Sequence, residues 1–421
     1  MKNFRSIKGT HDILPENSYK WRHLESIVHQ VCAQFGYQEI RTPIFEQNKL
    51  FSRSVGEESD IVTKEMYSWE DKKNSFLTLR PELTAPVARA YNQHNLGNLS
   101  PIHRFYYIGP LFRRERPQKG RQRQFHQFGI EAFGSNYAEQ DAEIIALAWQ
   151  LLAHFKLTNK IDLQVNSIGT SECRARYRVA LKQFLKPHFD ELSEISKRRF
   201  NTNPLRILDS KNKKEQTILK NSPRISDYYT KNDREHFNEM KSYLKAMNIP
   251  FTVNSGLVRG LDYYTKTVFE ITSNELGSQD ALLGGGRYDS LVETLGGKPT
   301  PGIGFAAGIE RILLLINEEN FKQHKPIPDI YLICLEKKGI PVSLNIAKKL
   351  RLQGLNIVSD PMRRSMKSQM RDANKLRARY VAILGESELK DKTIILKKLE
   401  SGKQENIKQE KIIKYFDNLT N

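Results

Sequence analysis

The sequence of 421 residues contains little cysteine. Its three cysteines, Cys32, Cys173 and Cys334, lie far apart and form no CxxC pair. This usage excludes a disulfide framework and indicates reduced structural thiols in a cytoplasmic protein. No uncharged apolar run approaches the roughly 20 residues that span a bilayer, and the N-terminus lacks the apolar region of a signal peptide. We therefore expect no membrane partner.

Negative charge is also scarce. Asp and Glu number 48 against 67 Lys and Arg, which gives a formal net charge of +19. Such an excess predicts a polyanionic partner, most simply a nucleic acid. With 38% hydrophobic residues the chain is no disordered tail. Its length suggests two to four domains of roughly 100 to 200 residues each.

The familiar motifs of nucleophilic and metal catalysis are missing. There is no HExxH, no GxSxG and no Cys/His cluster, so we expect no protein metal site. The glycine run LGGGRYD lacks the GK[ST] ending of a P-loop and the spacing of a dinucleotide fingerprint. What remains is a set of arginines and carboxylates. Such a set suits phosphoryl or nucleotidyl transfer, in which positioning and charge neutralisation do most of the catalysis.

The order of the segments predicts an α+β fold. Residues 17–35 and 139–155 repeat apolar side chains at helical period, and short aromatic segments read as strands without regular βαβ alternation. One such strand, 38–46, carries Pro43 and should lie at a sheet edge. We predict a mostly antiparallel domain over 1–325 with a polar helical insertion at about 171–254. Residues 326–421 then alternate strands and helices as a small α/β domain.

The most informative segment is a basic loop between two aromatic strands. Residues 113–124 hold six Lys and Arg against one Glu. In the strand that follows, period-two alternation places Phe125, Gln127 and Glu131 on one face. A buried amide and carboxylate are costly without partners, so these residues indicate ligand recognition. A solvated polar face is the alternative, which the dense loop makes less favoured.

Two further segments allow a functional and a structural interpretation each. Glu82 and Thr84 share a face just before a helix-like run, where they could hold an ammonium group or cap the helix. Arg259, followed by Tyr263 and Tyr264, suits a substrate phosphate or carboxylate, or is a structural arginine stacked on aromatic rings.

Glu310 and Arg311 begin a third segment, a helix that follows a glycine-containing strand. For each of them a solvated helix charge is the structural alternative to a functional role.

Taken together, the motifs resemble those of class II aminoacyl-tRNA synthetases. RTPIFE is similar to motif 1, FRRERPQKGRQRQFHQFGIE to motif 2 and GIGFAAGIERI to motif 3. LVRGLDYYT and LGGGRYD resemble the two signatures of the histidyl-tRNA synthetase family, as does KGTHDILP near the start. The resemblance runs almost end to end and includes RSMKSQMRDANKLRARYVAILGESEL in the C-terminal domain.

The resemblance implies a fold and an activity. The fold is an antiparallel-sheet class II catalytic domain with a helical insertion, followed by an α/β anticodon-binding domain. The activity is ATP-dependent ligation of L-histidine to its tRNA through histidyl-adenylate, with Mg²⁺ held mainly by the ATP phosphates. The expected assembly is a homodimer.

It also implies roles for residues that match the family's motifs. Arg113 and Arg259 would be catalytic, with Arg113 on the α-phosphate and on the histidine carboxylate. Phe125 and Arg311 would sandwich the adenine, and Arg311 would also lie near the ATP phosphates. Arg116 and Gln118 would reach the acceptor end of tRNA. The histidine-binding residues would be Glu82, Thr84, Gln127, Glu131, Tyr263 and Tyr264.

Two departures and two rivals accompany this interpretation. Arg114 stands where His is common in the family, and Lys266 stands where Gly is common. A catalytically silent relative, such as the synthetase-like regulatory subunit of ATP phosphoribosyltransferase, typically lacks the anticodon-binding domain and part of the histidine site, both of which this sequence keeps. Another class II synthetase would need a different amino-acid pocket.

Overall fold

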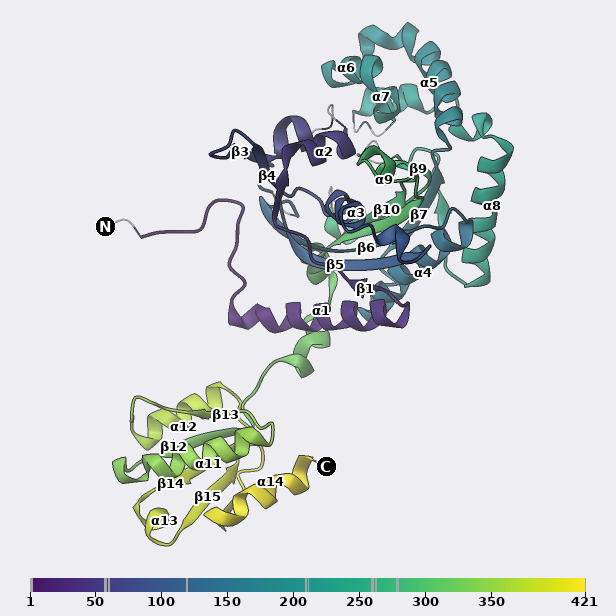
Figure 1. Cartoon of the computed structure of the whole chain (residues 1–421). Helices are drawn as coiled ribbons and strands as arrows, with labels where there is room; N and C mark the ends of the chain where they lie inside the picture. The colour runs from purple at the N-terminus through teal and green to yellow at the C-terminus, as the bar shows by residue number, and fades with distance from the viewer. Residues whose placement is uncertain are drawn as a thin grey trace. The chain divides into compact units, whose positions relative to one another are not determined.

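The structure is a computed structural model, in which the described residues are 3–56, 59, 61–118, 120–208, 210, 212–258, 261, 263–277 and 280–420. The chain divides into two compact units, Met1–Lys322 and Gln323–Asn421 (Figure 1). Over the described residues, no helix is long and apolar enough to cross a membrane.

The larger unit is built on an eight-stranded sheet with the order β1-β5-β6-β11-β10-β9-β7-β8. All pairs from β5 to β7 are antiparallel, and only the two edge pairs, β1 with β5 and β7 with β8, are parallel. The predicted antiparallel α+β class is therefore confirmed. The strands are β1 (Gln38–Glu39), β5 (His103–Phe112), β6 (Gln124–Phe133), β7 (Asp162–Ser167), β8 (Thr252–Val253), β9 (Thr265–Thr272), β10 (Ala281–Arg287) and β11 (Gly302–Gly308).

Two helices predicted from periodicity form part of the main core. α1 (Pro15–Gln34) and α4 (Ala138–His154) bury their apolar stripes in one cluster with Phe128 and Ile130 of β6. A second cluster contains side chains of α3 (Thr84–Gln93) and of the strand residue Tyr107. Because side chains alternate along a strand, Phe128 and Ile130 pack in the first cluster, whereas Gln127 and Glu131 point to the opposite face. This second face carries the candidate site.

The segment 38–46 differs from the prediction. It does not form one continuous strand, because β1 lies before Pro43 and β2 (Phe45–Gln47) after it. Each of the two is an edge strand of its sheet, so the predicted edge position is confirmed. Strand β2 joins β4 (Phe76–Leu79) and β3 (Tyr67–Glu70) in a separate three-stranded sheet. The reason is that Pro43 has no backbone N–H to continue a ladder, so the chain leaves the large sheet there.

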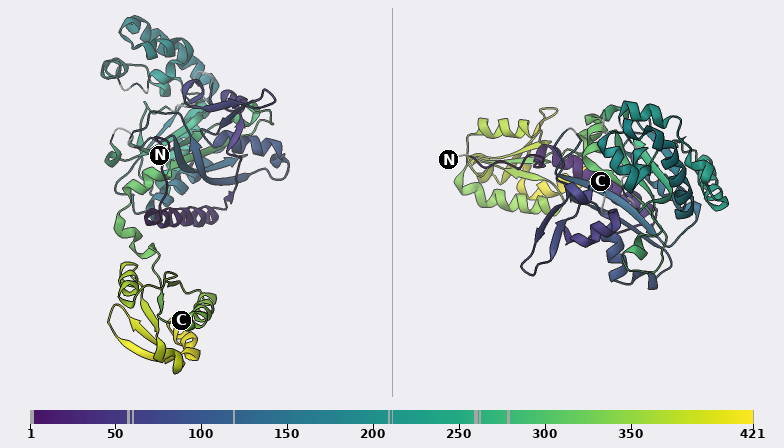
Figure 2. Two further views of the ribbon diagram at one scale, coloured as in Figure 1. Left: turned by 90° about the vertical axis from the view of Figure 1, so that its left-hand side faces the viewer. Right: turned by 90° about the horizontal axis from the view of Figure 1, so that it is seen from above.

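Helices fill most of the segment between β7 and β8, where polar sequence predicted an insertion. They are α5 (Ser171–Leu185), α6 (Glu194–Thr202), α7 (Lys213–Leu219) and α8 (Lys231–Ala246). The teal helices α5 to α7 gather beyond one side of the sheet (Figure 1 and Figure 2). α8 begins with a capping box between Thr230 and Asp233 and packs on α4. The insertion is thereby tied back to the main core.

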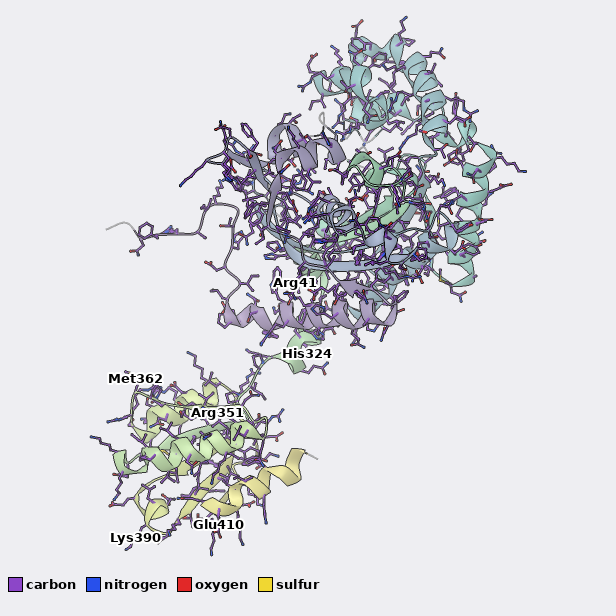
Figure 3. The ribbon with its side chains drawn as sticks, viewed as in Figure 1. Arg41, His324, Arg351, Met362, Lys390 and Glu410 are labelled. Atoms are coloured by element: carbon purple, nitrogen blue, oxygen red, sulfur yellow. The ribbon has the colours of Figure 1, made fainter. Side chains whose placement is uncertain are left out.

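The smaller unit contains a five-stranded sheet with the order β13-β12-β14-β15-β16. β12 pairs with β13 and β14 in parallel, and β14, β15 and β16 are antiparallel. Apolar clusters cover both faces, which confirms an α/β domain. Arg351, Met362, Lys390 and Glu410 are exposed side chains of this unit (Figure 3). Its elements are β12 (Ile330–Cys334), α11 (Ile340–Leu352), β13 (Ile357–Ser359), α12 (Met366–Lys375), β14 (Tyr380–Leu384), α13 (Glu386–Lys390), β15 (Thr393–Lys398), β16 (Gln404–Lys408) and α14 (Ile412–Thr420).

Candidate active site

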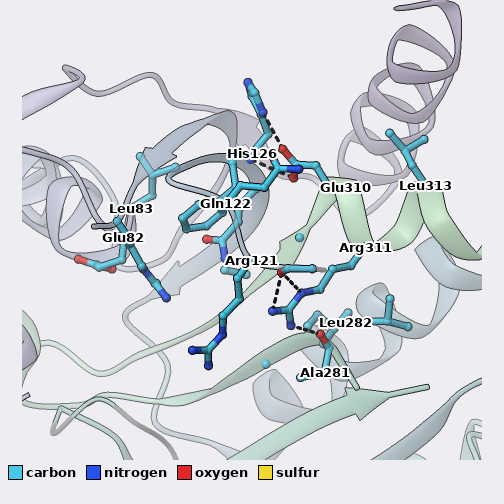
Figure 4. A pocket seen from close by; sticks show the side chains of 18 of the residues that line it. Glu82, Leu83, Arg121, Gln122, His126, Ala281, Leu282, Glu310, Arg311 and Leu313 are labelled. Atoms are coloured by element: carbon cyan, nitrogen blue, oxygen red, sulfur yellow. Dashed lines mark hydrogen bonds and ion pairs between the residues drawn. The ribbon is translucent and has the colours of Figure 1, made fainter. Parts of the chain in front are cut away.

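A cavity of about 650 Å³ extends from the second face of the large sheet to α1, which packs in the first cluster (Figure 4). Its walls come from the N-terminal segment, α1, the start of α3, strands β5, β6, β10 and β11, and α10 (Ile309–Leu315). Residues separated by up to 307 positions (318 − 11) thus share one pocket. The predicted site residues that line it are Glu82, Thr84, Arg113, Phe125, Gln127, Tyr263, Tyr264 and Arg311.

Four predicted residues are not in that lining. Glu131 is fully buried and lies directly behind it. Arg116 and Gln118 are exposed in the loop between β5 and β6, outside the cavity. Arg259 lies outside the described residues, so its predicted role stays a prediction.

Glu131 is held by three hydroxyl groups that do face the cavity. Its Oε1 accepts hydrogen bonds from Thr84 Oγ1 at 2.7 Å and from the Tyr107 hydroxyl at 3.1 Å. Its Oε2 accepts a hydrogen bond from the Tyr288 hydroxyl. All three donors line the cavity. The carboxylate is therefore linked to the pocket through Thr84, Tyr107 and Tyr288.

Tyr107 and Tyr288 were not among the site residues predicted from the sequence. Tyr288 belongs to the quoted segment LGGGRYD, and Tyr107 lies in the aromatic strand before the basic loop. The signal for Tyr107 is a glycine on the paired strand: Tyr107 of β5 stands opposite Gly129 of β6. A Cβ atom on Gly129 would lie 2.2 Å from the Tyr107 hydroxyl oxygen. The glycine thus provides the space that the phenol occupies.

Burial perturbs both carboxyl groups at this end of the cavity. It raises the pKa of Glu131 to about 8, although the hydroxyl hydrogen bonds of Tyr288 and Thr84 oppose the shift. It raises the pKa of Glu82 to about 7, against the backbone N–H groups of Ala85 and Thr84. A bound cation would stabilise the ionised form of either group. Raised carboxyl pKa values in a cleft are typical of a functional site.

Glu82 also caps a helix, which was the structural alternative. Its Oε2 accepts a hydrogen bond from Thr84 N at 2.7 Å, and its Oε1 accepts one from Ala85 N at 3.0 Å. These two bonds satisfy free N–H groups at the start of α3. The cap fixes the carboxylate in the cavity wall, so capping and ligand binding are compatible roles of one side chain.

Arginines concentrate at the other end of the cavity. Arg113 places its guanidinium 5.3 Å from the ring centroid of Phe125 and donates from Nε to Pro81 O at 2.9 Å. Glu115 pairs with Arg121 at 3.1 Å and with Arg113 at 3.9 Å. Arg113, Arg121 and Arg311 thus lie near Glu115, one of four glutamates in the lining. The excess of positive charge favours an anionic ligand.

Arg311 reaches this cluster from α10. Its Nη1 donates to Ala281 O at 2.5 Å, and its Nε and Nη2 donate to Gly120 O at 3.2 and 3.1 Å (Figure 4). Burial lowers its pKa, and the charges of Arg121 and Arg113 lower it further. The three bonds fix the plane of the guanidinium. An anion placed among these arginines would relieve their mutual repulsion.

The N-terminal segment forms one wall of the cavity and holds the basic loop. His11, Asp12 and Ile13 line the cavity. Just before them, Gly9 O accepts hydrogen bonds from Arg123 N at 2.7 Å and from Gln124 N at 3.3 Å. The chain therefore anchors the loop where it enters β6.

Comparison with known proteins identifies the family. A family model described as histidyl-tRNA synthetase matches residues 9–312, and one described as anticodon binding domain matches residues 329–419. The chain belongs to the histidyl-tRNA synthetase family. Members of this family are class II aminoacyl-tRNA synthetases, which attach an amino acid to tRNA at the expense of ATP. The recognition made from the sequence is thus confirmed.

Relatives of the histidyl-tRNA synthetase family match along the whole chain. The histidine–tRNA ligase of Chloroherpeton thalassium is 47% identical over 405 residues, which cover 95% of both chains. That of Halothermothrix orenii is 46% identical over 419 residues, which cover 99% of both chains. The crystal structure of apo S. aureus histidyl-tRNA synthetase superposes with a TM-score of 0.84 at 34% identity, covering 98% of this chain and 100% of that one. The expected two-domain architecture therefore holds over the full sequence.

Proposed function

We propose that the protein ligates L-histidine to its tRNA in two steps, through histidyl-adenylate, at this cavity. The observation that carries the proposal is the joint presence of two buried carboxyl groups and three arginines around one cavity. The first set suits an amino acid with a cationic ammonium, and the second suits a nucleoside triphosphate. We assign catalysis to residues 1–325 and anticodon binding to residues 326–421.

Histidine binds at the carboxyl end of the cavity in this proposal. Glu82 and Thr84 hold the α-ammonium, and Glu131 with Tyr263, Tyr264 and Gln127 recognises the imidazole. We add Tyr107 and Tyr288 to the proposed set, because both donate to Glu131 and line the cavity. An amino acid without ring nitrogens would leave buried polar groups without partners, which rejects it at the binding step.

ATP binds at the arginine end. Phe125 and Arg311 hold the adenine, and Arg113 contacts the α-phosphate. A carboxylate oxygen of histidine attacks the α-phosphorus, the bond to the bridging oxygen breaks, and pyrophosphate leaves with the electron pair. Arg113 and Arg259 stabilise the charge that develops. In this proposal Mg²⁺ enters with the ATP phosphates, which hold most of its coordination sphere.

Transfer to tRNA uses the exposed part of the basic loop. Arg116 and Gln118 project outside the cavity, where they can contact the acceptor end. We also propose a homodimer, supported by exposed apolar side chains on and beside the small sheet. Ile44, Phe45 and Trp69 are 45%, 53% and 41% exposed, which is unusual for large apolar residues that lie together.

Histidine-dependent exchange between ATP and pyrophosphate tests the proposal. Arg113→Ala should lower kcat for exchange by about 100- to 1,000-fold, because it removes a preorganised donor to the reacting phosphate. Arg351→Ala is the matched control, since Arg351 also donates to a backbone carbonyl, Ile357 O at 2.8 Å, but lies in the smaller unit. Exchange that does not require histidine would contradict the proposal.

A further inference from the structure

His126 and Glu310 form a hydrogen-bonded pair in the wall of the cavity (Figure 4). Glu310 Oε1 accepts hydrogen bonds from His126 N at 2.9 Å and from His126 Nδ1 at 3.0 Å, and Oε2 approaches His126 N at 3.0 Å. Trp21 of α1 packs edge-on against the imidazole, with ring centroids 4.9 Å apart. Only about a fifth of either side chain of the pair is exposed. Glu310 is therefore not the solvated helix charge that the sequence allowed.

The pair lies where the sheet ends. The ladder of β6 and β11 stops at Gln127 and Gly308, after which the chain turns into α10. His126 is the next residue of β6, and its backbone N–H has no partner in β11. The Glu310 carboxylate accepts a hydrogen bond from this N–H, as a strand carbonyl would within the ladder. This bond links the end of β6 to the start of α10.

The neighbours of the pair are the two residues assigned to the adenine. Phe125 precedes His126 in β6, and Arg311 follows Glu310 in α10. We propose that Glu310, through His126, is a positioning residue for ATP that sets the separation between Phe125 and Arg311. The inference rests on the proposed function, which assigns these two side chains to the nucleotide. It requires no contact between Glu310 and ATP.

The hydrogen bonds of Glu310 favour positioning over magnesium binding. Both carboxylate oxygens of Glu310 already accept from His126, and Trp21 closes one side of the imidazole. A comparable His–Glu pair on the surface, His188 with Glu191 at 2.9 Å, lies in the helical insertion with 38% and 63% of its side chains exposed. That pair provides a matched control with the same chemistry and no connection to the cavity.

The test measures KM for ATP and for histidine in the exchange reaction with the full-length protein. Glu310→Ala should raise KM for ATP about tenfold while kcat and KM for histidine change less than about twofold. Glu310→Gln keeps an oxygen that can accept from His126 N, so it should restore KM for ATP to within about threefold of the unmodified protein. Glu191→Ala should change none of these constants.

Three outcomes would overturn the inference. They are an unchanged KM for ATP in Glu310→Ala, an equal rise in both KM values, and a rise that disappears at high Mg²⁺, which would show a metal ligand. If Glu310→Ala fails to fold by circular dichroism, His126→Gln is measured instead. It removes the Nδ1 contact and keeps the backbone N–H bond, so it should show a smaller rise in KM for ATP with KM for histidine unchanged. Failure of the proposed function can be distinguished from failure of this inference, because the unmodified protein itself would then lack histidine-dependent exchange. In that case calorimetric titration with ATP decides whether Glu310→Gln and Glu310→Ala differ in nucleotide affinity.

Discussion

Glu131 and Gly304 stand directly opposite each other in strands β6 and β11. A Cβ atom on Gly304 would lie 2.0 Å from Glu131 Oε2 and 2.2 Å from Ile130 O. Only a residue without a side chain leaves the carboxylate its place behind the cavity. Glu131 can therefore occupy this position only because Gly304 has no Cβ atom.

Gly304→Ala should damage the histidine end of the cavity. The added Cβ atom must displace the backbone of β6 or the Glu131 carboxylate, which three hydroxyl groups hold in place. We expect a loss of stability of about 1–3 kcal/mol from overpacking and a rise in KM for histidine that exceeds the rise in KM for ATP. Gly256→Ala is the control, because its nearest neighbouring atom would lie at an ordinary 3.4 Å. Equal changes in the two KM values would contradict the assignment.

Glu131→Gln should weaken histidine binding selectively. The amide retains one accepting oxygen, so it cannot serve Thr84 and Tyr107 on one side and Tyr288 on the other as the carboxylate does. Loss of a hydrogen bond to a charged group is worth about 1.5–3 kcal/mol, or roughly 10- to 150-fold in kcat/KM for histidine. Steady-state exchange at saturating ATP measures this, and an unchanged value would remove Glu131 from the histidine site.

Histidine binding should release protons near neutral pH. In the unliganded protein, burial raises the pKa of Glu82 to about 7 and that of Glu131 to about 8. A bound ammonium favours the ionised carboxylates, so affinity should increase as pH rises from 6.5 to 8. Calorimetry in two buffers of different ionisation enthalpy counts the protons at pH 7.5, where free imidazole is largely neutral. Glu82→Gln should release fewer protons, and a pH-independent affinity would refute the linkage.

The same pKa shifts predict the pH dependence of stability. Between the ordinary value of 4.5 and the raised values, the folded state binds more protons than the unfolded state. The contribution of these two groups is therefore complete below about pH 4.5 and is lost as pH rises through 7 and 8. Chemical unfolding of the unliganded protein should show a shallower decrease over this range for Glu131→Gln than for the unmodified chain.

Gly9→Ala should loosen the basic loop. Gly9 has a φ of +91°, and its added Cβ would lie 2.8 Å from Pro117 Cγ and 3.0 Å from Arg123 Cγ. We expect charging of tRNA to fall about tenfold in kcat/KM, since about 1.4 kcal/mol of lost positioning corresponds to that factor. Gly36→Ala is the control for backbone strain alone, because Gly36 has a φ of +74° with no atom within 4 Å of the added Cβ. If Gly9→Ala and Gly36→Ala lowered kcat/KM for charging equally, backbone strain alone would explain the loss and the loop would have no role in it.

Phe45→Glu should dissociate the proposed dimer. A charge would replace an exposed apolar ring whose centroid lies 6.1 Å from that of Trp69. Burying an unpaired carboxylate in an interface is costly, so light scattering should report a monomer. Val179→Glu, at an equally exposed residue of the helical insertion, should leave the mass unchanged. A dimer that persists in Phe45→Glu would place the interface elsewhere.

Periodicity and motif order predicted the main architecture. α1 and α4 are local features, because apolar residues at i, i+3 and i+4 specify a helix whatever it packs against. The prediction of one strand over 38–46 was wrong because Pro43 divides this segment between two sheets. Which strand each half pairs with depends on residues far away in the sequence. The fold class thus followed from local patterns, whereas the connection of the small sheet did not.

The candidate site was predictable as a set of residues but not as a geometry. Alternation along β6 placed Phe125, Gln127 and Glu131 on one face, and the structure agrees with that face. Alternation cannot reveal depth, so it did not show that Glu131 lies behind the lining. It also could not find Tyr107, which owes its place to the glycine opposite in a neighbouring strand.

The two glycines around Glu131 have a consequence for folding. Gly129 faces Tyr107 across one ladder, and Gly304 faces Glu131 across the other. A slip of one residue in β6 against β11 would set a bulky Ile303 or Phe305 opposite Glu131 and turn the carboxylate toward the apolar core. The carboxyl end of the cavity therefore forms only when β6 pairs with β11 in the correct register. A misregistered chain would lose both its core and its amino acid site, so histidine binding reports correct assembly of the sheet.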